Sequence, residues 1–145
     1  IFLNNIYLKN KKYLYLIKMQ TIELKTMVLG PISGKTTFIR NITGKNYDHI
    51  NNTLGCEVTP LDIHTNNGKR RINLWEVGSR FQGLKDKYCI CADLAIIFKN
   101  KNNEHLQFEN WLSSSIPRIY VDNYSINNNE VIIQNIKNVI SQNIL

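Results

Sequence analysis

The sequence predicts a single α/β domain whose sheet is mostly parallel and contains one antiparallel hairpin. Three observations predict this fold class. Apolar residues lead into a glycine-rich turn and then a helical pattern at residues 27–38. The continuous apolar run Leu94–Phe98 is typical of a strand buried on both faces. Asn66-Asn67-Gly68 separates two strand-like segments and suits a tight hairpin turn.

The first half of the chain alternates strand-like and helix-like patterns, as α/β folds do. Apolar positions alternate along the segment before the hairpin turn, and Ile72 and Leu74 share one face of the segment after it. The predicted elements are, in order, a strand at Thr21–Leu29, a helix at Thr37–Ile42, a polar loop at Thr43–Asn52, a strand at Cys56–His64 and a strand at Arg71–Trp75.

The second half continues the alternation, with apolar residues at helical spacing in two segments. The predicted elements are a loop at Gly78–Gln82, a short helix at Leu84–Cys91, a strand at Leu94–Phe98, a helix at His105–Ser115, a strand at Ile119–Val121 and a helix at Glu130–Leu145.

Residues 1–18 stand apart from the domain, which we expect to span residues 19–145. Lys11-Lys12 interrupts the apolar run and no small-residue cleavage site follows, so the segment is neither a typical signal peptide nor a membrane span. A basic, partly apolar helix lying on a membrane is one alternative. The favoured interpretation is an in-frame leader upstream of a translation start at Met19.

The charge and cysteine content exclude several classes of function. The net charge of +7 suggests nucleic acid or a membrane surface as partner. Four of these positive charges lie in residues 1–18, however, so we expect neither partner. Cys56, Cys89 and Cys91 are an odd number without paired spacing, which favours a reducing compartment over disulfides. No His or Cys partner set accompanies Cys89-Ile90-Cys91, so we expect buried thiols there rather than a metal site.

The stretch Gly30-Pro31-Ile32-Ser33-Gly34-Lys35-Thr36-Thr37 is the main candidate site. A strand, a glycine turn, Gly-Lys-Thr and a helix is the layout of a phosphate-binding loop. In such a loop, backbone N–H groups and the helix N-terminus surround an anion, while the Lys reaches the outer phosphates and the Thr hydroxyl binds Mg²⁺. A chance Gly-Lys-Thr at a helix start is the alternative interpretation.

A longer stretch carries a family resemblance. Thr53-Leu54-Gly55-Cys56-Glu57-Val58-Thr59-Pro60-Leu61-Asp62-Ile63-His64-Thr65-Asn66-Asn67-Gly68, continued by Asn73-Leu74-Trp75, resembles the region from switch I through the second and third strands of the Ran family of small GTPases. Gly83-Leu84-Lys85-Asp86, Tyr88 and Ala95-Ile96-Ile97 extend it. The resemblance covers Leu24 to about Val121.

The resemblance implies a P-loop small-GTPase fold with a truncated C-terminal part, and GTP or GDP with Mg²⁺ as ligands. It implies a nucleotide-dependent switch in nucleocytoplasmic transport, present in nucleus and cytoplasm, with importin-β-type receptors and Ran regulators as partners. The implied nucleotide-binding residues are Gly30, Ser33, Gly34, Lys35, Thr36, Thr37, Thr53, Gly78 and Asn123. Thr36 and Thr53 would bind Mg²⁺, Glu76 would contact it through water, and the Gly78 N–H would meet the γ-phosphate.

The sequence departs from the family in the loop and in switch II. One residue is missing between Gly30 and Gly34, and Pro31 has no N–H to donate to a phosphate. Glu76-Val77-Gly78-Ser79-Arg80 stands where the family has Asp-Thr-Ala-Gly-Gln. The Gln that orients the attacking water is therefore absent, so we expect weak or absent hydrolysis and name no catalytic residue. Arg80 is interpreted as a surface residue rather than an arginine finger.

The guanine-reading motif also departs from the family. Asn-Lys-x-Asp is represented only by Asn123-Tyr124-Ser125-Ile126, without the acidic acceptor. Tyr124 is interpreted as packing at its strand end rather than stacking on a base. Two alternatives to a GTP-binding switch stay open: a degenerate pseudo-GTPase that acts as a protein-binding mimic of Ran, and a decaying or fragmentary reading frame.

Overall fold

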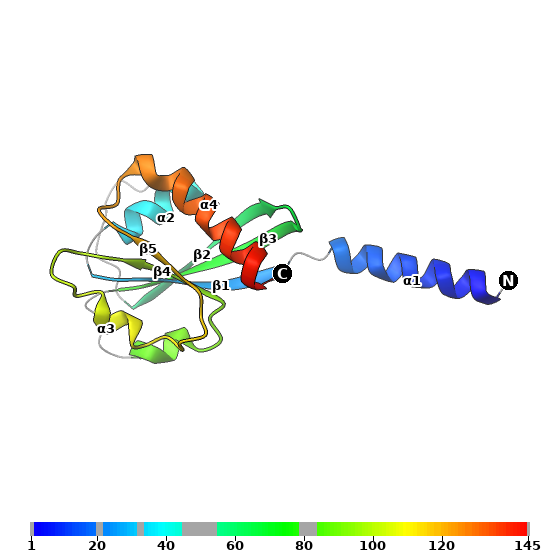
Figure 1. Ribbon diagram of the computed structural model, residues 1–145, viewed down its shortest axis with the longest axis horizontal. Helices are drawn as coiled ribbons and strands as arrows, with labels where there is room; N and C mark the ends of the chain where they lie inside the picture. The colour runs from blue at the N-terminus through cyan, green and yellow to red at the C-terminus, as the bar shows by residue number, and fades with distance from the viewer. Residues whose placement is uncertain (1, 20–21, 32–33, 45–54, 79–83, 145) are drawn as a thin grey trace.

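The computed structural model describes residues 2–19, 22–31, 34–44, 55–78 and 84–144. Five strands form one sheet, with helices on both of its faces (Figure 1). The elements are α1 (Phe2–Met19), β1 (Ile22–Leu29), α2 (Lys35–Thr43), β2 (Cys56–Thr65), β3 (Gly68–Val77), a 3₁₀ helix (Lys85–Cys89), β4 (Leu94–Phe98), α3 (Leu106–Glu109), β5 (Arg118–Val121), a second 3₁₀ helix (Ile126–Asn128) and α4 (Asn129–Val139), which continues as a π-helix (Ile140–Ile144).

The strand order in the sheet is β2-β3-β1-β4-β5. β1 pairs in parallel with both β3 and β4, and β4 pairs in parallel with β5. Only β2 is antiparallel to its neighbour, because a hairpin turn joins it to β3. The carboxyl ends of β1, β3, β4 and β5 therefore meet on one side of the sheet, which we call its carboxyl edge. The hairpin turn lies on the opposite side, where β3 begins.

β2 is an edge strand, and it is protected against pairing with other chains. Pro60 lies in the middle of β2, opposite Asn73 of β3. Because proline has no N–H to give to a ladder, it is tolerated in a strand whose outer side is not paired. The exposed charged residues Glu57 and Asp62 flank it along the strand.

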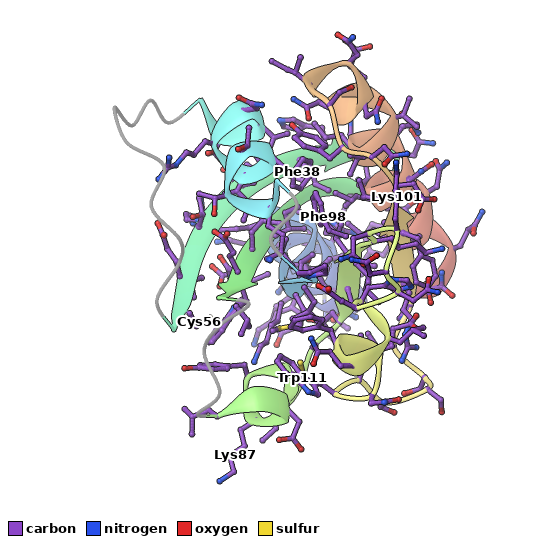
Figure 2. All side chains as sticks on the ribbon, turned by 90° about the vertical axis from the view of Figure 1, so that its left-hand side faces the viewer. Phe38, Cys56, Lys87, Phe98, Lys101 and Trp111 are labelled. Carbon is purple, nitrogen blue, oxygen red and sulfur yellow. The ribbon has the colours of Figure 1, made fainter. Side chains whose placement is uncertain are left out.

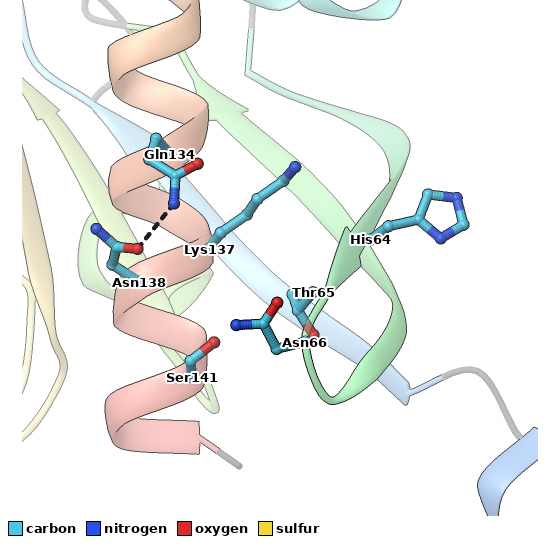
Figure 3. Close-up of a pocket in the computed structure, with 7 residues that line it drawn as sticks. All are labelled: His64, Thr65, Asn66, Gln134, Lys137, Asn138 and Ser141. Carbon is cyan, nitrogen blue, oxygen red and sulfur yellow. Dashed lines mark hydrogen bonds between the residues drawn. The ribbon is translucent and has the colours of Figure 1, made fainter.

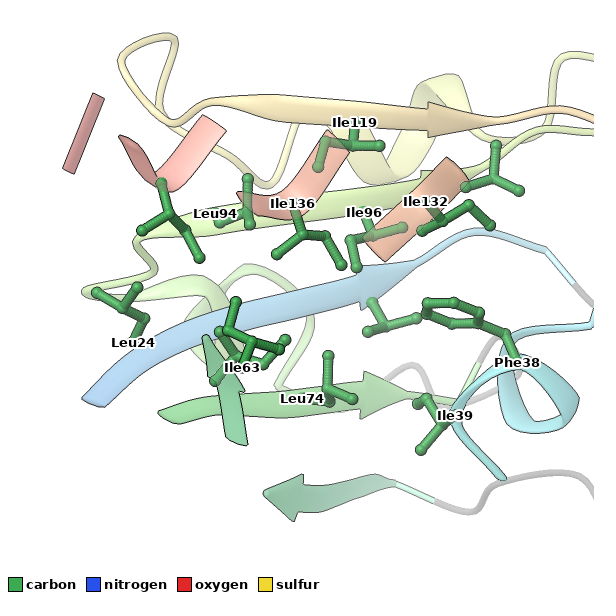
Figure 4. Packing of buried hydrophobic residues seen from close by; sticks show 14 of the residues in the cluster. Leu24, Phe38, Ile39, Ile63, Leu74, Leu94, Ile96, Ile119, Ile132 and Ile136 are labelled. Carbon is green, nitrogen blue, oxygen red and sulfur yellow. The ribbon is translucent and has the colours of Figure 1, made fainter. Parts of the chain in front are cut away.

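Helices α2 and α4 cover one face of the sheet (Figures 1 and 4). Side chains alternate between the two faces of a strand, so Leu24 and Val28 of β1 point to this side. They join a cluster of buried residues from every strand and from both helices. Its helical members are Phe38 and Ile39 of α2 and Ile132 and Ile136 of α4, with Ile140 beyond.

The opposite face has a thinner cover, made by the first 3₁₀ helix and α3. Met27 and Leu29 of β1 and Ala95 and Ile97 of β4 point to this side, against Phe108 of α3. In Figure 2, Phe38 and Phe98 lie on one side of the sheet and Trp111 on the other. All five residues of β4 are buried, because β4 has helices on both faces and strands on both sides.

Helix α1 lies apart from the sheet domain (Figure 1). Its described side chains, residues 5–14, are all exposed. Among the described helices, none is both long enough and apolar enough to cross a membrane.

The predicted α/β class, with a mostly parallel sheet and one antiparallel pair, is confirmed. Two helix predictions were wrong in extent. The helix predicted at His105–Ser115 is α-helical only over Leu106–Glu109, because Asn110 and the serines at 113–115 favour turns over helix. The helix predicted at Thr37–Ile42 already begins at Lys35, because Gly34 adopts φ +89° and serves as its N-cap. The short helix predicted at Leu84–Cys91 is present as a 3₁₀ helix at Lys85–Cys89.

We expect α4 to stabilise the domain through its buried face alone. Ile136→Ala removes a side chain with no exposed surface and should lower the free energy of unfolding by about 3 kcal/mol. Val131→Ala, at a position 62% exposed on the same helix, should change it by less than about 0.5 kcal/mol. Urea denaturation of both variants measures the difference, and equal effects would contradict the observed orientation of α4.

Candidate phosphate-binding site

The candidate site lies at the carboxyl edge of the sheet, where β1 ends. From β1 the chain passes to α2 on one face, and after β3 it passes to the 3₁₀ helix on the other face before it returns as β4. β1 thus lies between β3 and β4, and the helices that precede these two strands in the chain pack on opposite faces of the sheet. In open α/β sheets, the crevice beyond the carboxyl ends at such a switch point is the usual ligand site.

Two glycines give the loop between β1 and α2 its shape. Gly30 adopts φ +135°, and a Cβ there would lie 2.4 Å from the Phe98 carbonyl oxygen of β4. Gly34 adopts φ +89°, and a Cβ there would lie 2.9 Å from Cδ1 of Tyr124. Both positions therefore need glycine for its backbone freedom and for its small size. The loop is held closely against the ends of β4 and β5.

Lys35 folds back over this loop. Its side chain is 5% exposed, and Nζ donates to the carbonyl oxygens of Gly30 at 2.6 Å and Pro31 at 2.9 Å. An ammonium has three N–H groups, so two go to loop carbonyls and a third can serve an anion. Burial lowers the pKa of Lys35 from 10.5 to about 8, although the Glu76 carboxylate raises it.

Thr36 and Glu76 form a second polar contact next to Lys35. The Thr36 hydroxyl donates to Oε1 of Glu76, which is 3% exposed at the end of β3. These residues are 40 positions apart in sequence and meet because β1 and β3 run in parallel and end together. A buried cation, a hydroxyl and a buried carboxylate therefore converge at one point of the sheet edge.

The α2 N-terminus completes the anion-binding geometry. Its first intrahelical hydrogen bond runs from Phe38 N–H to Gly34 O at 2.8 Å. The amides of the preceding turn have no acceptor inside the helix and add to the positive end of its dipole. Thr37 lies in this turn and is half-buried.

Tyr124 forms a wall of the site. Its ring packs against Phe38 and Phe98, with ring centroids 5.6 and 5.8 Å away. Its hydroxyl accepts from Nδ2 of Asn41 at 3.1 Å and donates to Oδ1 of Asn129 at 2.6 Å. The interpretation that Tyr124 packs at its strand end is confirmed. Its contact with Gly34 and its two hydrogen bonds had no signal in the sequence.

Gly78 and Asn123, two of the predicted site residues, lie just beyond the ends of β3 and β5. The N–H of Gly78 donates to the Gly55 carbonyl at 2.7 Å, so the hairpin ladder occupies the donor expected to meet a γ-phosphate. Gly78 directly follows β3, which explains why it joins the ladder. Asn123 is exposed beyond the end of β5 and adopts φ +46°. The predictions for Ser33, Thr53 and Arg80 fall outside the described residues.

A polar cavity of about 170 Å³ lies at the opposite edge, between the hairpin turn and α4 (Figure 3). Lys137 contributes an ammonium, and Gln134 donates to Asn138 at 2.9 Å along the same helix. The cavity lies away from Lys35. The amino end of β1 pairs with Arg70, close to the hairpin turn, whereas its carboxyl end, which leads to Lys35, pairs with Glu76. Its lining includes Ser141 and His64, but the His64 ring points away from Ser141 (Figure 3), so the two are not arranged as a nucleophile and its base.

Cys56 and Cys89 provide no competing nucleophile. The prediction of buried thiols is confirmed for Cys89 and wrong for Cys91, which is exposed. All three are free thiols, and burial raises the pKa of Cys89 to about 11 and raises that of Cys56. A thiol with a raised pKa is a poor nucleophile and metal ligand at neutral pH. Within the described part of the chain, no three His, Cys, Asp or Glu side chains form a metal-binding group.

No protein-family model matches the chain. The functional assignment therefore depends on the residues and geometry at the carboxyl edge of the sheet.

We expect Gly30 to be far less replaceable than another glycine with positive φ. Gly30→Ala should lower the free energy of unfolding by about 3–4 kcal/mol, because it adds overlap with Phe98 to backbone strain. Gly44→Ala should cost about 1 kcal/mol, since Gly44 has φ +68° but nothing within 4 Å of a Cβ. Urea denaturation tests this, and similar costs would show that Gly30 does not lie against β4.

Lys35 should give the domain an unusual dependence on pH. The unfolded state keeps its Lys35 proton up to about pH 10.5, whereas the folded state releases it near pH 8. Unfolding therefore takes up a proton between these values, and the free energy of unfolding should rise with pH by up to about 3 kcal/mol. Lys35→Met should remove this rise, and Lys101→Met, at an exposed lysine, should not. Urea denaturation from pH 7 to 11 measures it; identical slopes in both variants would contradict the burial of Lys35.

Proposed function

We propose that this protein is a Ran-like small GTP-binding protein, a nucleotide-dependent switch with weak or absent GTP hydrolysis. The observation that carries the proposal is the position of the Lys35 ammonium. It lies against the Gly30 and Pro31 carbonyls at the N-terminus of α2, next to the Thr36–Glu76 contact. This arrangement supports a P-loop GTPase fold, to which the α/β sheet also conforms.

The phosphates of a nucleotide would supply what the buried Lys35 lacks. Desolvation disfavours its charge, and the nearby Glu76 only partly offsets that cost. A phosphate at the α2 N-terminus would receive the third Lys35 N–H and the first-turn amides. Pro31 offers no N–H, so the loop supplies fewer donors than the standard one, and we expect weaker binding than in the family.

Thr36 and Glu76 fit a Mg²⁺ ion that is bound together with a nucleotide. Mg²⁺ commonly takes one or two protein oxygens, several waters and phosphate oxygens rather than an all-protein cage. The Thr36 hydroxyl would be a direct ligand and Glu76 would orient a bound water. Mg²⁺ there would neutralise phosphate charge.

Selectivity for guanine should be low. A base-reading site normally presents a carboxylate to the guanine N1 and N2 groups, and residues 123–129 include none. Tyr124, which occupies the second position of the Asn-Lys-x-Asp motif, packs between Phe38 and Phe98 with its hydroxyl engaged. We therefore expect GTP and ATP to bind within about tenfold of each other, since no buried polar group would be left unpaired by adenine.

The decisive experiment is a titration of the full chain with a fluorescent guanine nucleotide in the presence of Mg²⁺. We expect micromolar or tighter binding. Lys35→Ala should weaken it by about ten- to a hundredfold, as expected for loss of a charge-assisted hydrogen bond. Lys137→Ala, at the opposite edge of the sheet, is the matched control and should bind as the parent does. Single-turnover assays should detect little hydrolysis. Equal affinity in the Lys35 and Lys137 variants would reject the site.

One observation favours a second candidate, a pseudo-GTPase that mimics Ran in protein binding. The β2–β3 hairpin, which carries most of the resemblance, is fully paired from Cys56 to Val77, and its edge exposes Val58 at 44%. The N–H of Gly78 is engaged by that same ladder. Under this candidate the hairpin surface is permanently presented, without a nucleotide to release it.

The two candidates differ in how receptor binding depends on nucleotide. Capture of an importin-β-type receptor by purified protein that retains no nucleotide, unaffected by added GTP or by Lys35→Ala, would favour the mimic. Capture that requires GTP and Mg²⁺ and is lost in Lys35→Ala would favour the switch. Val58→Asp should abolish capture in either case, because it puts a charge on the exposed hairpin surface.

A further inference from the structure

We propose that helix α1 lies on membranes that contain anionic lipids and anchors the chain there. The proposal takes the alternative of an interfacial helix over the two expectations from the sequence, that residues 1–18 precede the translation start and that a membrane is not a partner. It does not rest on the nucleotide site, because α1 lies apart from the sheet domain (Figure 1). It concerns an interfacial helix, and the finding that no described helix could span a membrane is compatible with it.

Four exposed apolar residues of α1 lie on one unpartnered face. Successive residues turn by about 100° in an α-helix, so Tyr13, Ile6, Leu14 and Tyr7 fall, in that order, within an arc of about 120°. Their exposed fractions are 68%, 43%, 59% and 66%. Water thus contacts four large apolar side chains side by side, which is a costly arrangement unless something covers them.

The order of residue types across this face matches the depth profile of a membrane surface. Ile6 and Leu14 lie inside the arc, and Tyr13 and Tyr7 lie at its two margins. Lys9 lies next to Tyr13 and Lys11 next to Tyr7, each about 40° further around the helix. Aliphatic residues suit the acyl region, tyrosines suit the interface, and lysine stems extend from the margins to the headgroups.

Charge decides which occupant this face suits. Residues 1–18 contain four lysines, and the first acidic residue of the chain is Glu23. A second copy of α1 would bring four more lysines and no carboxylate to pair with them, so charge opposes a dimer through this face. A surface of anionic lipids attracts each of these lysines, by about fivefold in affinity for each one close to the surface.

Asn10 is the exception, because it lies near the centre of the arc, between Ile6 and Leu14. Its amide must enter the headgroup boundary with the apolar residues around it, which weakens binding. The position gives the proposal a gain-of-function test. Asn10→Leu should tighten membrane binding by about tenfold, since it completes the apolar face.

The test is co-sedimentation of the full chain with vesicles of phosphatidylcholine alone or with phosphatidylserine at about 30%, near 0.1 M salt. We expect binding to the second and little binding to the first. Raising the salt to about 1 M, where the screening length falls from about 10 to about 3 Å, should release most of the protein. The double variant Lys9→Gln and Lys11→Gln, which removes the two lysines at the margins of the face, should bind about twenty-five-fold more weakly.

A matched pair of leucine variants tests the apolar face. Leu14→Gln should weaken binding by about tenfold. Leu8→Gln changes a leucine of similar exposure, 61% against 59%, that points to the other side of the helix, and should change binding by less than about twofold. Equal losses would reject the face assigned here. Circular dichroism of each variant with vesicles confirms that its helix content is kept.

Other outcomes would overturn the proposal. Equal binding to both kinds of vesicle, or none to either, would reject an anionic membrane as the occupant. Self-association in analytical ultracentrifugation that Leu14→Gln abolishes, without vesicle binding, would assign the face to a second copy. Lys35→Ala should leave vesicle binding unchanged, so failure of the membrane proposal and failure of the nucleotide proposal are distinguishable.

Discussion

The contact between the Lys35 ammonium and the carbonyls of Gly30 and Pro31 is the interaction on which the carboxyl edge of the sheet depends. It ties the first residue of α2 back to the end of β1, across the turn that Gly34 begins. Gly30 lies against Phe98 at the end of β4, and Gly34 lies against Tyr124 beyond β5. A change at Lys35 is therefore felt by three neighbouring segments of the fold.

Burial of the Lys35 ammonium disfavours its charged form. A buried ammonium loses its hydration, and two carbonyl oxygens with a nearby Glu76 carboxylate offset only part of that loss, as the lowered pKa of Lys35 shows. Proteins retain such costly groups where a ligand uses them. The charge-deficient surroundings of Lys35 have the electrostatic character that suits a phosphate group, which is why the geometry supports nucleotide binding beyond the motif itself.

Sequence patterns predicted the features of this fold that depend on near neighbours in the chain. Leu94–Phe98 is a buried strand and the turn at Asn66-Asn67 closes a hairpin, because both signals lie within a few residues. The Thr36–Glu76 hydrogen bond joins positions 40 apart, and no local pattern encodes it. The family resemblance placed both residues near one metal ion but did not predict that they touch.

The errors have similar physical causes. The apolar spacing from Leu106 to Leu112 is helical, yet the polar residues between and after them end α3 at Glu109. The resemblance gave Gly78 a role at a phosphate and no sign of its hydrogen bond to Gly55, which lies 23 positions earlier in the chain. Tyr124 carried no sign of its hydrogen bonds to Asn41 and Asn129, since these come from two different helices.

Pro60 has a consequence for how other proteins can recognise the hairpin. Its nitrogen interrupts the row of main-chain donors along the free side of β2, so a foreign strand cannot extend the sheet there without a gap in its hydrogen bonding. Recognition of this edge must then come from side chains such as Val58 and Asp62, which makes it specific to sequence rather than to backbone shape. The same gap disfavours the joining of two copies of the protein sheet to sheet through β2 as their concentration rises.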